Sequence, residues 1–378
     1  MPNSKFKILN SLFIFFLIVL WIFSGIPALY LPLPSGEEIR IPPKIKEAYA
    51  NDWFNTSYKF RKKLTLDNTL VSGSTDLSNF PVLIAYTDAD LARDTDCAGG
   101  IDGPCNANGF DIVFTDSSHS PAKLDHEIEK YTAASGLIAM WVEVPTLGAT
   151  VDTDIYVYYG NSSISTTQEA ITGVWDTNYV GVWHLAETSG AHLDSTSNNN
   201  DSTTVTVGTQ GSATGIVAGA DDFTAVTNRV IFPDSTQWDR NGTTLTLEAW
   251  INGADNDSVF QSVIGRMNTT DWDYALNASQ GAGLTFRPHC YNDSGNGHIV
   301  SSVDVNNNAW TYLVCALDDS ANSGTIYIDG TSRGASSTDF IFNDTANTLV
   351  IGDIQPSSEA YVGVIDEVRF STSVRSAD

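Results

Sequence analysis

From Asn51 onward the sequence is a succession of short runs rich in β-branched and aromatic residues, each bounded by turn-forming residues. Examples are PVLIAYT (81–87), FDIVFTD (110–116), LIAMWVEVP (137–145), DIYVYYG (154–160), LTLEAWI (245–251), TIYIDG (325–330) and YVGVIDEVRF (361–370). Such runs predict strands, and turn signals at short intervals are typical of sandwiches and barrels. No sustained helical period and no βαβ alternation interrupts them. The chain is therefore predicted to be all-β.

A polar, Ser/Thr-rich stretch divides this strand pattern. GNSSISTTQEAITG (160–173) follows a strong strand, and 378 residues are enough for two separate cores. We therefore expect two β-sandwich domains, the first at 51–170 and the second at 175–378.

The N-terminus predicts export. Lys5 and Lys7 precede an apolar run from Leu12 to Phe23, which fits a secretory signal. Alternatively, Ile8–Tyr30 is long enough to span a bilayer as a membrane anchor. Residues 1–30 are thus a signal peptide or a hydrophobic anchoring helix, and 31–50 form a Pro-rich linker. Either interpretation places residues 51–378 outside the cell or on its surface.

The charge balance limits the classes of partner that the chain is expected to bind. The chain has 45 Asp and Glu against 19 Lys and Arg, a net charge of −26. Such a chain repels phosphate backbones, which argues against nucleic acid as a partner. The same charge favours solubility and suits divalent cations.

The four cysteines form two local pairs. Cys97 and Cys105 flank a Gly-rich loop, and Cys290 and Cys315 flank a predicted strand-turn-strand stretch. An even number in an exported chain favours disulfides within each pair, and no CxxC motif points to metal or redox chemistry. Two buried thiols are the alternative for the second pair.

N-x-S/T sequons recur along the chain. They are the pattern of a surface glycoprotein, or the chance product of a composition rich in Asn, Ser and Thr. They begin at Asn55, Asn161, Asn200, Asn241, Asn256, Asn268, Asn277, Asn292 and Asn343.

Several segments of the second domain match a known pattern in order. They are GVWHLAE (181–187), LDSTSNNN (193–200), TLTLEAWI (244–251), NAWTYLVCALDDSANSGTIYIDG (308–330) and VGVIDEVRFSTSVRSAD (362–378). This domain resembles the laminin-G-like, concanavalin A-like jelly rolls. The resemblance implies a two-sheet jelly roll that is truncated at its C-terminus, because the family pattern continues beyond VRSAD.

The first domain has a resemblance of its own. Its matching segments are WFNTSYKFRKKLTLDN (53–68), NFPVLIAYT (79–87), FDIVFTD (110–116), LDHEIEKY (124–131), MWVEVPTL (140–147) and IYVYYGN (155–161). It resembles domain of unknown function 2341, which precedes laminin-G-like modules in prokaryotic surface proteins. That resemblance implies an architecture rather than an activity.

These observations favour an exported cell-surface binding or adhesion protein that recognises carbohydrate or a surface glycoprotein and is not an enzyme. One alternative is a structural subunit of a surface layer, stalk or filament. Another is a polysaccharide-degrading enzyme, or a non-catalytic part of one.

The enzyme alternative rests on Asp125, Glu127 and Glu129. Alternate residues of a strand share a face, and paired carboxylates can hydrolyse glycosides. Their spacing does not reproduce the motif of concanavalin-like glycosidases, and a solvated strand face is the competing interpretation. No G-x-S-x-G or H-E-x-x-H motif occurs. His184 is expected to be structural.

A structural Ca²⁺ is the one cofactor expected. Its candidate ligands are Asp194, in a polar loop, and Asp366, where related sandwiches place an acid near the start of the last strand. The alternatives are an Asx-turn at Asp194 and a turn cap at Asp366.

Sugar binding needs exposed aromatic faces beside polar groups. Trp272, Tyr274, Tyr291 and Asn292 lie in polar, loop-like surroundings and are the candidate ligand-binding residues, with Trp238 in a similar setting. Core packing is expected instead for the tryptophans inside strand patterns, Trp183, Trp250 and Trp310.

Overall fold

The computed structural model describes residues 30–32, 38–40, 53–97, 103–240, 243–253, 260–267, 272–280, 286–292, 299–305, 308–336, 342, 346–354 and 360–375. Residues 1–56 with 115–123 form one compact unit, and residues 57–114 with 124–378 form a second. In the first unit, β1 (Tyr30–Pro32) pairs antiparallel with β2 (Glu38–Arg40).

The predicted signal or anchor helix lies outside the described residues, except for Tyr30, as does most of the predicted linker. Within the described part of the chain, no helix combines the length and apolarity needed to cross a bilayer.

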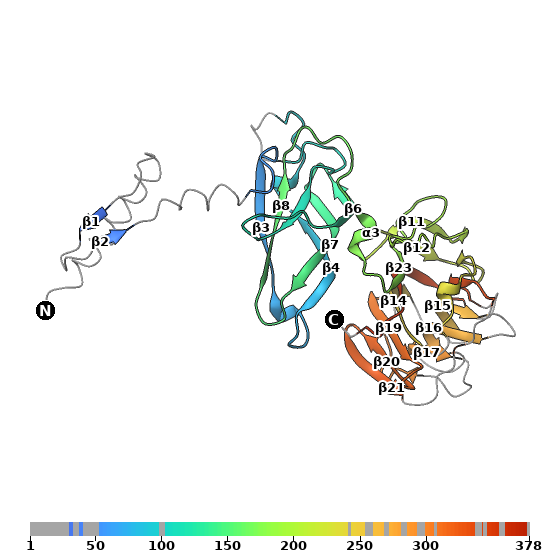
Figure 1. Ribbon diagram of the computed structural model, residues 1–378. Helices are drawn as coiled ribbons and strands as arrows, with labels where there is room; N and C mark the ends of the chain where they lie inside the picture. The colour runs from blue at the N-terminus through green and yellow to red at the C-terminus, as the bar shows by residue number, and fades with distance from the viewer. Residues whose placement is uncertain are drawn as a thin grey trace. The chain divides into compact units, whose positions relative to one another are not determined.

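The first sandwich consists of two three-stranded sheets (Figure 1). One has the order β3 (Phe60–Leu66), β8 (Thr153–Tyr159), β5 (Val113–Asp116), and the other β4 (Leu77–Thr87), β7 (Leu137–Leu147), β6 (His126–Thr132). Inward-pointing residues of both sheets, among them Phe114, Met140 and Val157, form its core. Short 3-10 turns, η1 (Asn68–Leu70) and η2 (Ala89–Leu91), follow β3 and β4.

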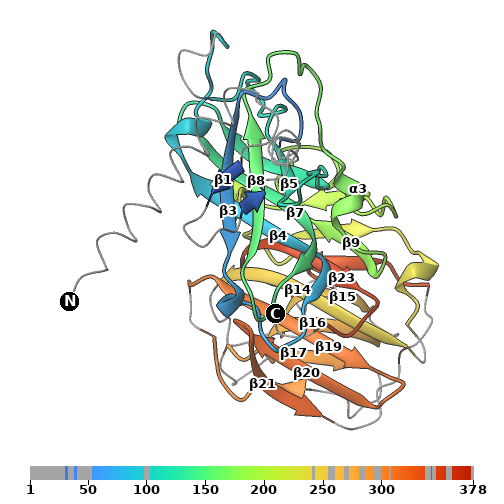
Figure 2. The ribbon, with the colours of Figure 1, turned by 60° about the vertical axis from the view of Figure 1, so that its left-hand side comes forward.

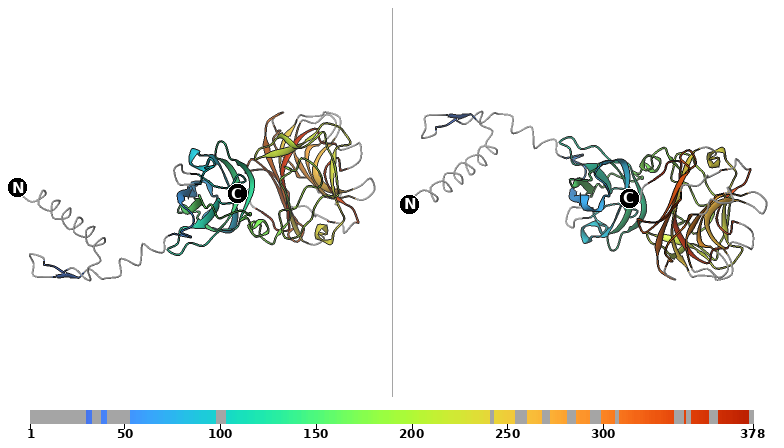
Figure 3. Two further views of the ribbon diagram at one scale, coloured as in Figure 1. Left: turned by 90° about the horizontal axis from the view of Figure 1, so that it is seen from above. Right: turned by 90° about the horizontal axis from the view of Figure 1, so that it is seen from below.

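The second sandwich stacks a seven-stranded sheet on an eight-stranded one (Figure 2). The first has the order β10-β13-β22-β15-β16-β17-β18 and the second β11-β12-β23-β14-β19-β20-β21, with β9 paired to β23. The bounds are β9 (Tyr179–Trp183), β10 (Thr204–Thr206), β11 (Thr209–Thr214), β12 (Gly219–Phe223), β13 (Arg229–Phe232), β14 (Thr244–Gly253), β15 (Phe260–Met267), β16 (Trp272–Gln280), β17 (His289–Asn292), β18 (Ile299–Val300), β19 (Thr311–Asp318), β20 (Ser323–Ile328), β21 (Thr331–Ser336), β22 (Leu349–Gly352) and β23 (Gly363–Ser371). Figure 3 shows the layers of this sandwich from two further directions. Buried residues from both sheets form one apolar core. The all-β prediction and the jelly-roll architecture are confirmed.

Strand alternation decides which residues enter this core. In β14, Leu245, Leu247 and Ala249 are fully buried between the sheets, because alternate side chains share a face. Trp250 has the opposite parity and was expected in the core, but it lies half-buried on the outer face. There it packs against Tyr312, its cross-strand partner on β19. Trp183 is buried in the core, as predicted.

The cysteines are joined in the two expected pairs. Cys97 bonds to Cys105 and closes a short loop of the first sandwich. Cys290 on β17 bonds to Cys315 on β19, so this bridge ties the two sheets of the second sandwich through its core.

Buried ion pairs of His192 connect the segment between β9 and β12 to β12 itself. His192 is fully buried, with Nδ1 2.7 Å from Glu187 Oε2 and Nε2 2.8 Å from Asp221 Oδ2. Burial alone would lower the pKa of His192, but the hydrogen bonds to Asp221 and Glu187 outweigh it and raise the pKa to about 9.

We therefore expect the protein to lose stability between pH 6.5 and about 9. A pKa raised by folding stabilises fully below the unfolded value near 6.5, and that contribution disappears as pH rises through the folded value. The loss should be on the order of 3 kcal/mol. Urea unfolding of wild type and His192→Gln at pH 6 and pH 9.5 measures it. An equal pH dependence in the two proteins would contradict the assignment to His192.

Candidate functional site

A polar cluster forms where β6, the end of β9 and β23 converge. Each of the three segments departs from regular geometry there. In β6 the pairing to β7 skips Glu129, which is the extra residue of a bulge. Glu367 on β23 has a φ of 52°, and Leu185, next to His184, a φ of 54°. Bulges and left-handed residues re-aim side chains and concentrate at functional sites.

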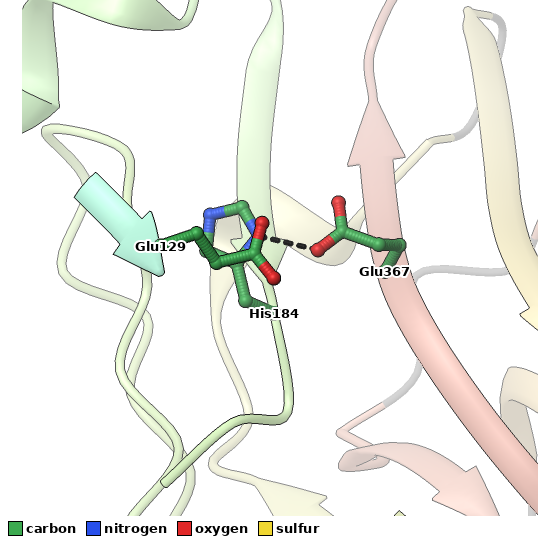
Figure 4. A group of neighbouring side chains, drawn as sticks. All are labelled: Glu129, His184 and Glu367. Carbon is green, nitrogen blue, oxygen red and sulfur yellow. Dashed lines mark hydrogen bonds and ion pairs between the residues drawn. The ribbon is translucent and has the colours of Figure 1, made fainter. Parts of the chain in front are cut away.

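His184 is the centre of this cluster (Figure 4). Its Nδ1 lies 2.6 Å from Glu367 Oε1 and 3.6 Å from Glu129 Oε2, and its Nε2 lies 3.3 Å from Glu127 Oε2. The side chains of Glu129 and Glu367 are only 2% and 1% exposed. One buried imidazole is thus surrounded by three carboxylates.

Indole and hydroxyl groups fix two of these carboxylates. Trp141 Nε1 donates to Glu129 Oε2 at 2.9 Å, and Trp175 Nε1 donates to Glu127 Oε2 at 3.2 Å. Ser195 Oγ donates to the second oxygen of Glu127 at 2.6 Å. Both oxygens of Glu127 are therefore occupied, whereas Glu129 uses only one.

Arg369 fixes the third carboxylate. One terminal nitrogen donates to Glu367 Oε2 at 2.7 Å, and the other lies 3.7 Å from Glu248 Oε2. The guanidinium also lies over the rings of Trp141 and Trp175, 4.6 and 5.1 Å from their centroids. A desolvated cation over aromatic faces gains from their quadrupoles.

The environment separates the pKa values of the two innermost acids. Burial, followed by the charge of Glu367, raises the pKa of Glu129 to about 8. Burial acts in the same direction on Glu367, but His184 and Arg369 outweigh it and hold the pKa of Glu367 at about 2. Burial opposes the charge on His184, yet Glu367, Glu127 and Glu129 raise its pKa well above the usual value. Glu129 therefore holds its proton more tightly than Glu367 does.

Two of the three acids singled out for glycoside hydrolysis, Glu127 and Glu129, belong to this buried cluster. Glu127 and Glu129 project from β6, whereas Asp125 precedes the strand. The competing interpretation of a solvated face is wrong for Glu127 and Glu129, because their side chains are 9% and 2% exposed. Sequence reasoning missed their convergence on His184, since no local pattern links positions so far apart in the chain.

Asp194, the first candidate for Ca²⁺, lies in the Asx-turn that was its alternative. Its Oδ1 accepts from the backbone N–H of Val182 and Thr196, and its Oδ2 from Thr196 Oγ1 and the N–H of Asn200. Four donors use the lone pairs of the carboxylate.

Asp366, the second candidate, is fully buried and similarly engaged. It accepts from the backbone N–H groups of Ile216, Val217 and Glu367. Burial, followed by the neighbouring charge of Glu367, raises the pKa of Asp366 to about 7. As arranged here, neither aspartate has a carboxylate oxygen without a donor, so the residues present do not fit a Ca²⁺ ion without rearrangement. Ca²⁺ dependence stays a prediction.

Two of the predicted sugar-contacting residues lie inside the protein. Tyr274 is fully buried in the core, where its hydroxyl donates to the carbonyl of Trp238 at 2.8 Å, and Trp238 is buried as well. Tyr291 is 8% exposed and packs in a small apolar cluster. These three rings have no face open to a sugar. Trp272 and Asn292 belong to β16 and β17, but their side chains lie outside the described part of the chain.

Burial also bears on the sequons. Asn161 and Asn277 are only 3% and 2% exposed. A glycan needs an accessible amide, so these two sequons are not acceptors in the folded protein, in keeping with the compositional interpretation for them.

A groove with the chemistry expected of a sugar site lies elsewhere. It has a volume of about 260 Å³ and is lined from β4, β9 and the segment before it, β14, β19, and β23 and the segment after it. We call it the β4–β19 groove. Half-buried aromatic rings line it at Phe80 and Tyr312, with the exposed amide of Asn79 beside them.

Charged side chains of the β4–β19 groove are held in fixed pairs. Both carboxylate oxygens of Asp176 lie 2.9 Å from a terminal nitrogen of Arg375, whose guanidinium lies 3.7 Å from the ring centroid of Tyr179. Tyr312 donates its hydroxyl to Glu248 Oε2 at 2.6 Å.

Comparisons with known proteins place the chain by fold. Residues 223–378 match the family described as the concanavalin A-like lectin/glucanases superfamily. Residues 108–199 match a domain of unknown function (DUF2341). Both resemblances predicted from the sequence are confirmed, in the predicted order. No curated protein matched the chain.

Part of this chain is also similar to three solved structures. Domain 4 of an extracellular arabinanase from Geobacillus stearothermophilus, in complex with arabinotriose, is 16% identical with a TM-score of 0.41, covering 53% of this chain and 95% of that one. The binding domain of Paraclostridial Mosquitocidal Protein 1 is 12% identical (TM-score 0.40; 53% and 50% covered). The receptor binding domain of botulinum neurotoxin C/D mosaic serotype is also 12% identical (TM-score 0.40; 53% and 49% covered). This chain thus spans about half the length of the two toxin domains it matches.

Proposed function

We propose that the chain is an exported cell-surface protein that binds carbohydrate in the β4–β19 groove and performs no chemistry there. The observation that carries the proposal is the composition of the groove. Half-buried aromatic rings stand beside paired carboxylate, guanidinium and amide groups, on a jelly roll of the concanavalin A-like lectin/glucanases superfamily.

Sugars are recognised by this combination. The C–H face of a pyranose ring packs on an aromatic ring such as Phe80 or Tyr312. Its hydroxyl groups exchange hydrogen bonds with planar, pre-oriented polar groups, which Asp176 and Arg375 provide as a pair.

The same pairing favours binding over hydrolysis. A glycosidase needs one carboxyl group to deliver a proton and a second to attack or to activate water. In the β4–β19 groove, Asp176 is held by Arg375, and Glu248 accepts from Tyr312 and lies near Arg369.

A location outside the cytoplasm is supported by the covalent chemistry of the chain. Two disulfides persist in oxidising compartments. The apolar segment that begins at Leu12 would direct export, as a cleaved signal or as an anchor. The expected partner is a polysaccharide or the glycan of a surface glycoprotein.

We expect the full chain to be retained on at least one polymer of a panel of insoluble polysaccharides. Tyr312→Ala should weaken retention about tenfold, equivalent to roughly 1.4 kcal/mol, because it removes a stacking face. Tyr312→Phe should bind nearly as wild type, because it keeps the ring. Tyr327→Ala is the matched control, since Tyr327 is also half-buried on β20 of the same sheet but does not line the groove.

Retention of the wild-type chain and of each variant is measured in Ca²⁺ and in EDTA. Retention that disappears in EDTA and is restored by Ca²⁺ but not by Zn²⁺ would support a structural Ca²⁺, and equal retention would remove that prediction. If no polymer retains the wild-type chain, the carbohydrate proposal fails, and the structural-subunit alternative gains weight.

A further inference from the structure

We propose that Glu129, His184 and Glu367 bind one transition-metal ion of the zinc class. Such an ion would link β6 of the first sandwich to the end of β9 and to β23 of the second. The proposal concerns a different place from the β4–β19 groove, which none of these three residues lines.

The three ligand atoms are spaced almost as the ligands of a single metal ion are. One nitrogen of His184 and one oxygen from each glutamate all lie within 4.8 Å of one another. A tetrahedral Zn²⁺ about 2.0–2.1 Å from each ligand separates the ligand atoms by roughly 3.3 Å. His184 Nδ1 is 3.6 Å from Glu129 Oε2 and 2.6 Å from Glu367 Oε1. Small side-chain movements would open the second distance enough.

A buried carboxylate oxygen without a hydrogen-bond partner is a second, independent observation in favour of a cation site. Glu129 Oε1 is buried without a hydrogen-bond partner on a side chain that is 2% exposed. A buried acceptor left unsatisfied costs about 1–3 kcal/mol, and more when it is charged. Figure 4 shows the carboxylates of Glu129 and Glu367 both directed toward the imidazole of His184.

The groups that contact the three proposed ligands are of the kind that orient metal ligands in known metal sites. A metal-bound histidine usually donates its other N–H to a carboxylate. Glu127 Oε2 is near enough for that role, 3.3 Å from His184 Nε2, although the two atoms form no hydrogen bond as arranged. The ligand carboxylates are themselves oriented, Glu129 by the indole of Trp141 and Glu367 by Arg369.

Ligand chemistry selects the class of ion. One imidazole nitrogen with two carboxylates suits Zn²⁺ and its neighbours, whereas Ca²⁺ prefers six to eight oxygens. Three protein ligands leave a fourth position open, and a pocket of about 430 Å³ adjoins the cluster, lined by Glu129 and His184 among others. Water or a small ligand could complete the coordination from that side.

The test is Zn²⁺ binding to the untagged full chain after chelator treatment, measured by competition with a chromophoric chelator. We expect one equivalent per chain and a higher melting temperature with Zn²⁺. Glu129→Gln should lose at least tenfold in affinity, while its amide oxygen can still accept from Trp141. Glu127→Gln should weaken affinity by about 10–100-fold while one site remains. Glu143→Gln, a half-buried glutamate of β7 outside the cluster, is the matched control and should bind as wild type.

Absence of stoichiometric Zn²⁺ binding would overturn the proposal, as would wild-type affinity in Glu129→Gln. Should Glu129→Gln fail to fold, judged by its melting without metal, His184→Gln provides the same comparison. Retention on polysaccharide is measured in parallel. Loss of Zn²⁺ binding with unchanged retention would separate this site from the proposed function.

Discussion

Replacing Arg369 by methionine should lower the free energy of unfolding by about 3–5 kcal/mol. The side chain of Arg369 is 11% exposed, and its guanidinium lies between Glu367 and Glu248, over two indole rings. Methionine fills much of the volume, but it leaves Glu367 with His184 as its one charged partner and Glu248 with the hydroxyl of Tyr312. Removing one partner of a buried ion pair is costly because the remaining charge stays desolvated. Urea unfolding at neutral pH measures the change.

Arg287→Met is the control for this prediction. Arg287 pairs with Asp304 at 2.9 Å, but both side chains are more than a third exposed. Solvent-exposed pairs contribute about 0–1 kcal/mol. A loss in Arg369→Met no larger than in Arg287→Met would show that Arg369 does not neutralise the buried acids.

Replacing Cys290 and Cys315 together by alanine should cost about 3–4 kcal/mol. The bridge closes a segment of 25 residues and ties β17 to β19 across the core. A cross-link restricts the unfolded chain more when it closes a longer loop. The two alanines would also leave unfilled space among fully buried neighbours.

The other bridge provides the comparison. Cys97 and Cys105 are only eight residues apart, so removing them should cost about 2–3 kcal/mol on the same basis. Unfolding of the two double variants and of wild type, all at one pH, gives the order. A smaller loss for the Cys290–Cys315 variant would contradict the view that this bridge stabilises the core more.

The fold was predictable because strand alternation is local. In β14, Leu245 and Leu247 alternate with Thr246 and Glu248, so the sequence itself shows which face enters the apolar core. Thr246 and Glu248 are buried as well, on the other face of the sheet. The same rule assigns Trp250 to the outer face. The expectation of a core tryptophan there followed residue type in preference to parity, and it was wrong.

The burial of aromatic residues that have polar neighbours in the sequence was harder to predict. Asp273, beside Tyr274, gave that stretch the look of a loop, yet Asp273 is itself fully buried near Arg266. Paired burial of charged groups cannot be recognised from one segment, because the partner lies on a neighbouring strand. The burial of Tyr274 was missed for that reason.

The cluster of Glu129, His184 and Glu367 could not be predicted from the sequence, for a different reason. Its members come from three strands, and the bulge at Glu129 and the left-handed backbone at Glu367 decide where their carboxylates point. Sequence reasoning found Glu129 and His184 separately. It had no means of placing Glu367 beside them.

The most direct test of the carbohydrate proposal is a crystal structure of the full chain with an oligosaccharide of the polymer that retains it. We predict a sugar ring packed on Tyr312 or Phe80 in the β4–β19 groove, with hydroxyl groups on Asp176 or Arg375. A sugar bound at Trp272 and Asn292 instead, or an empty groove at saturating oligosaccharide, would contradict it.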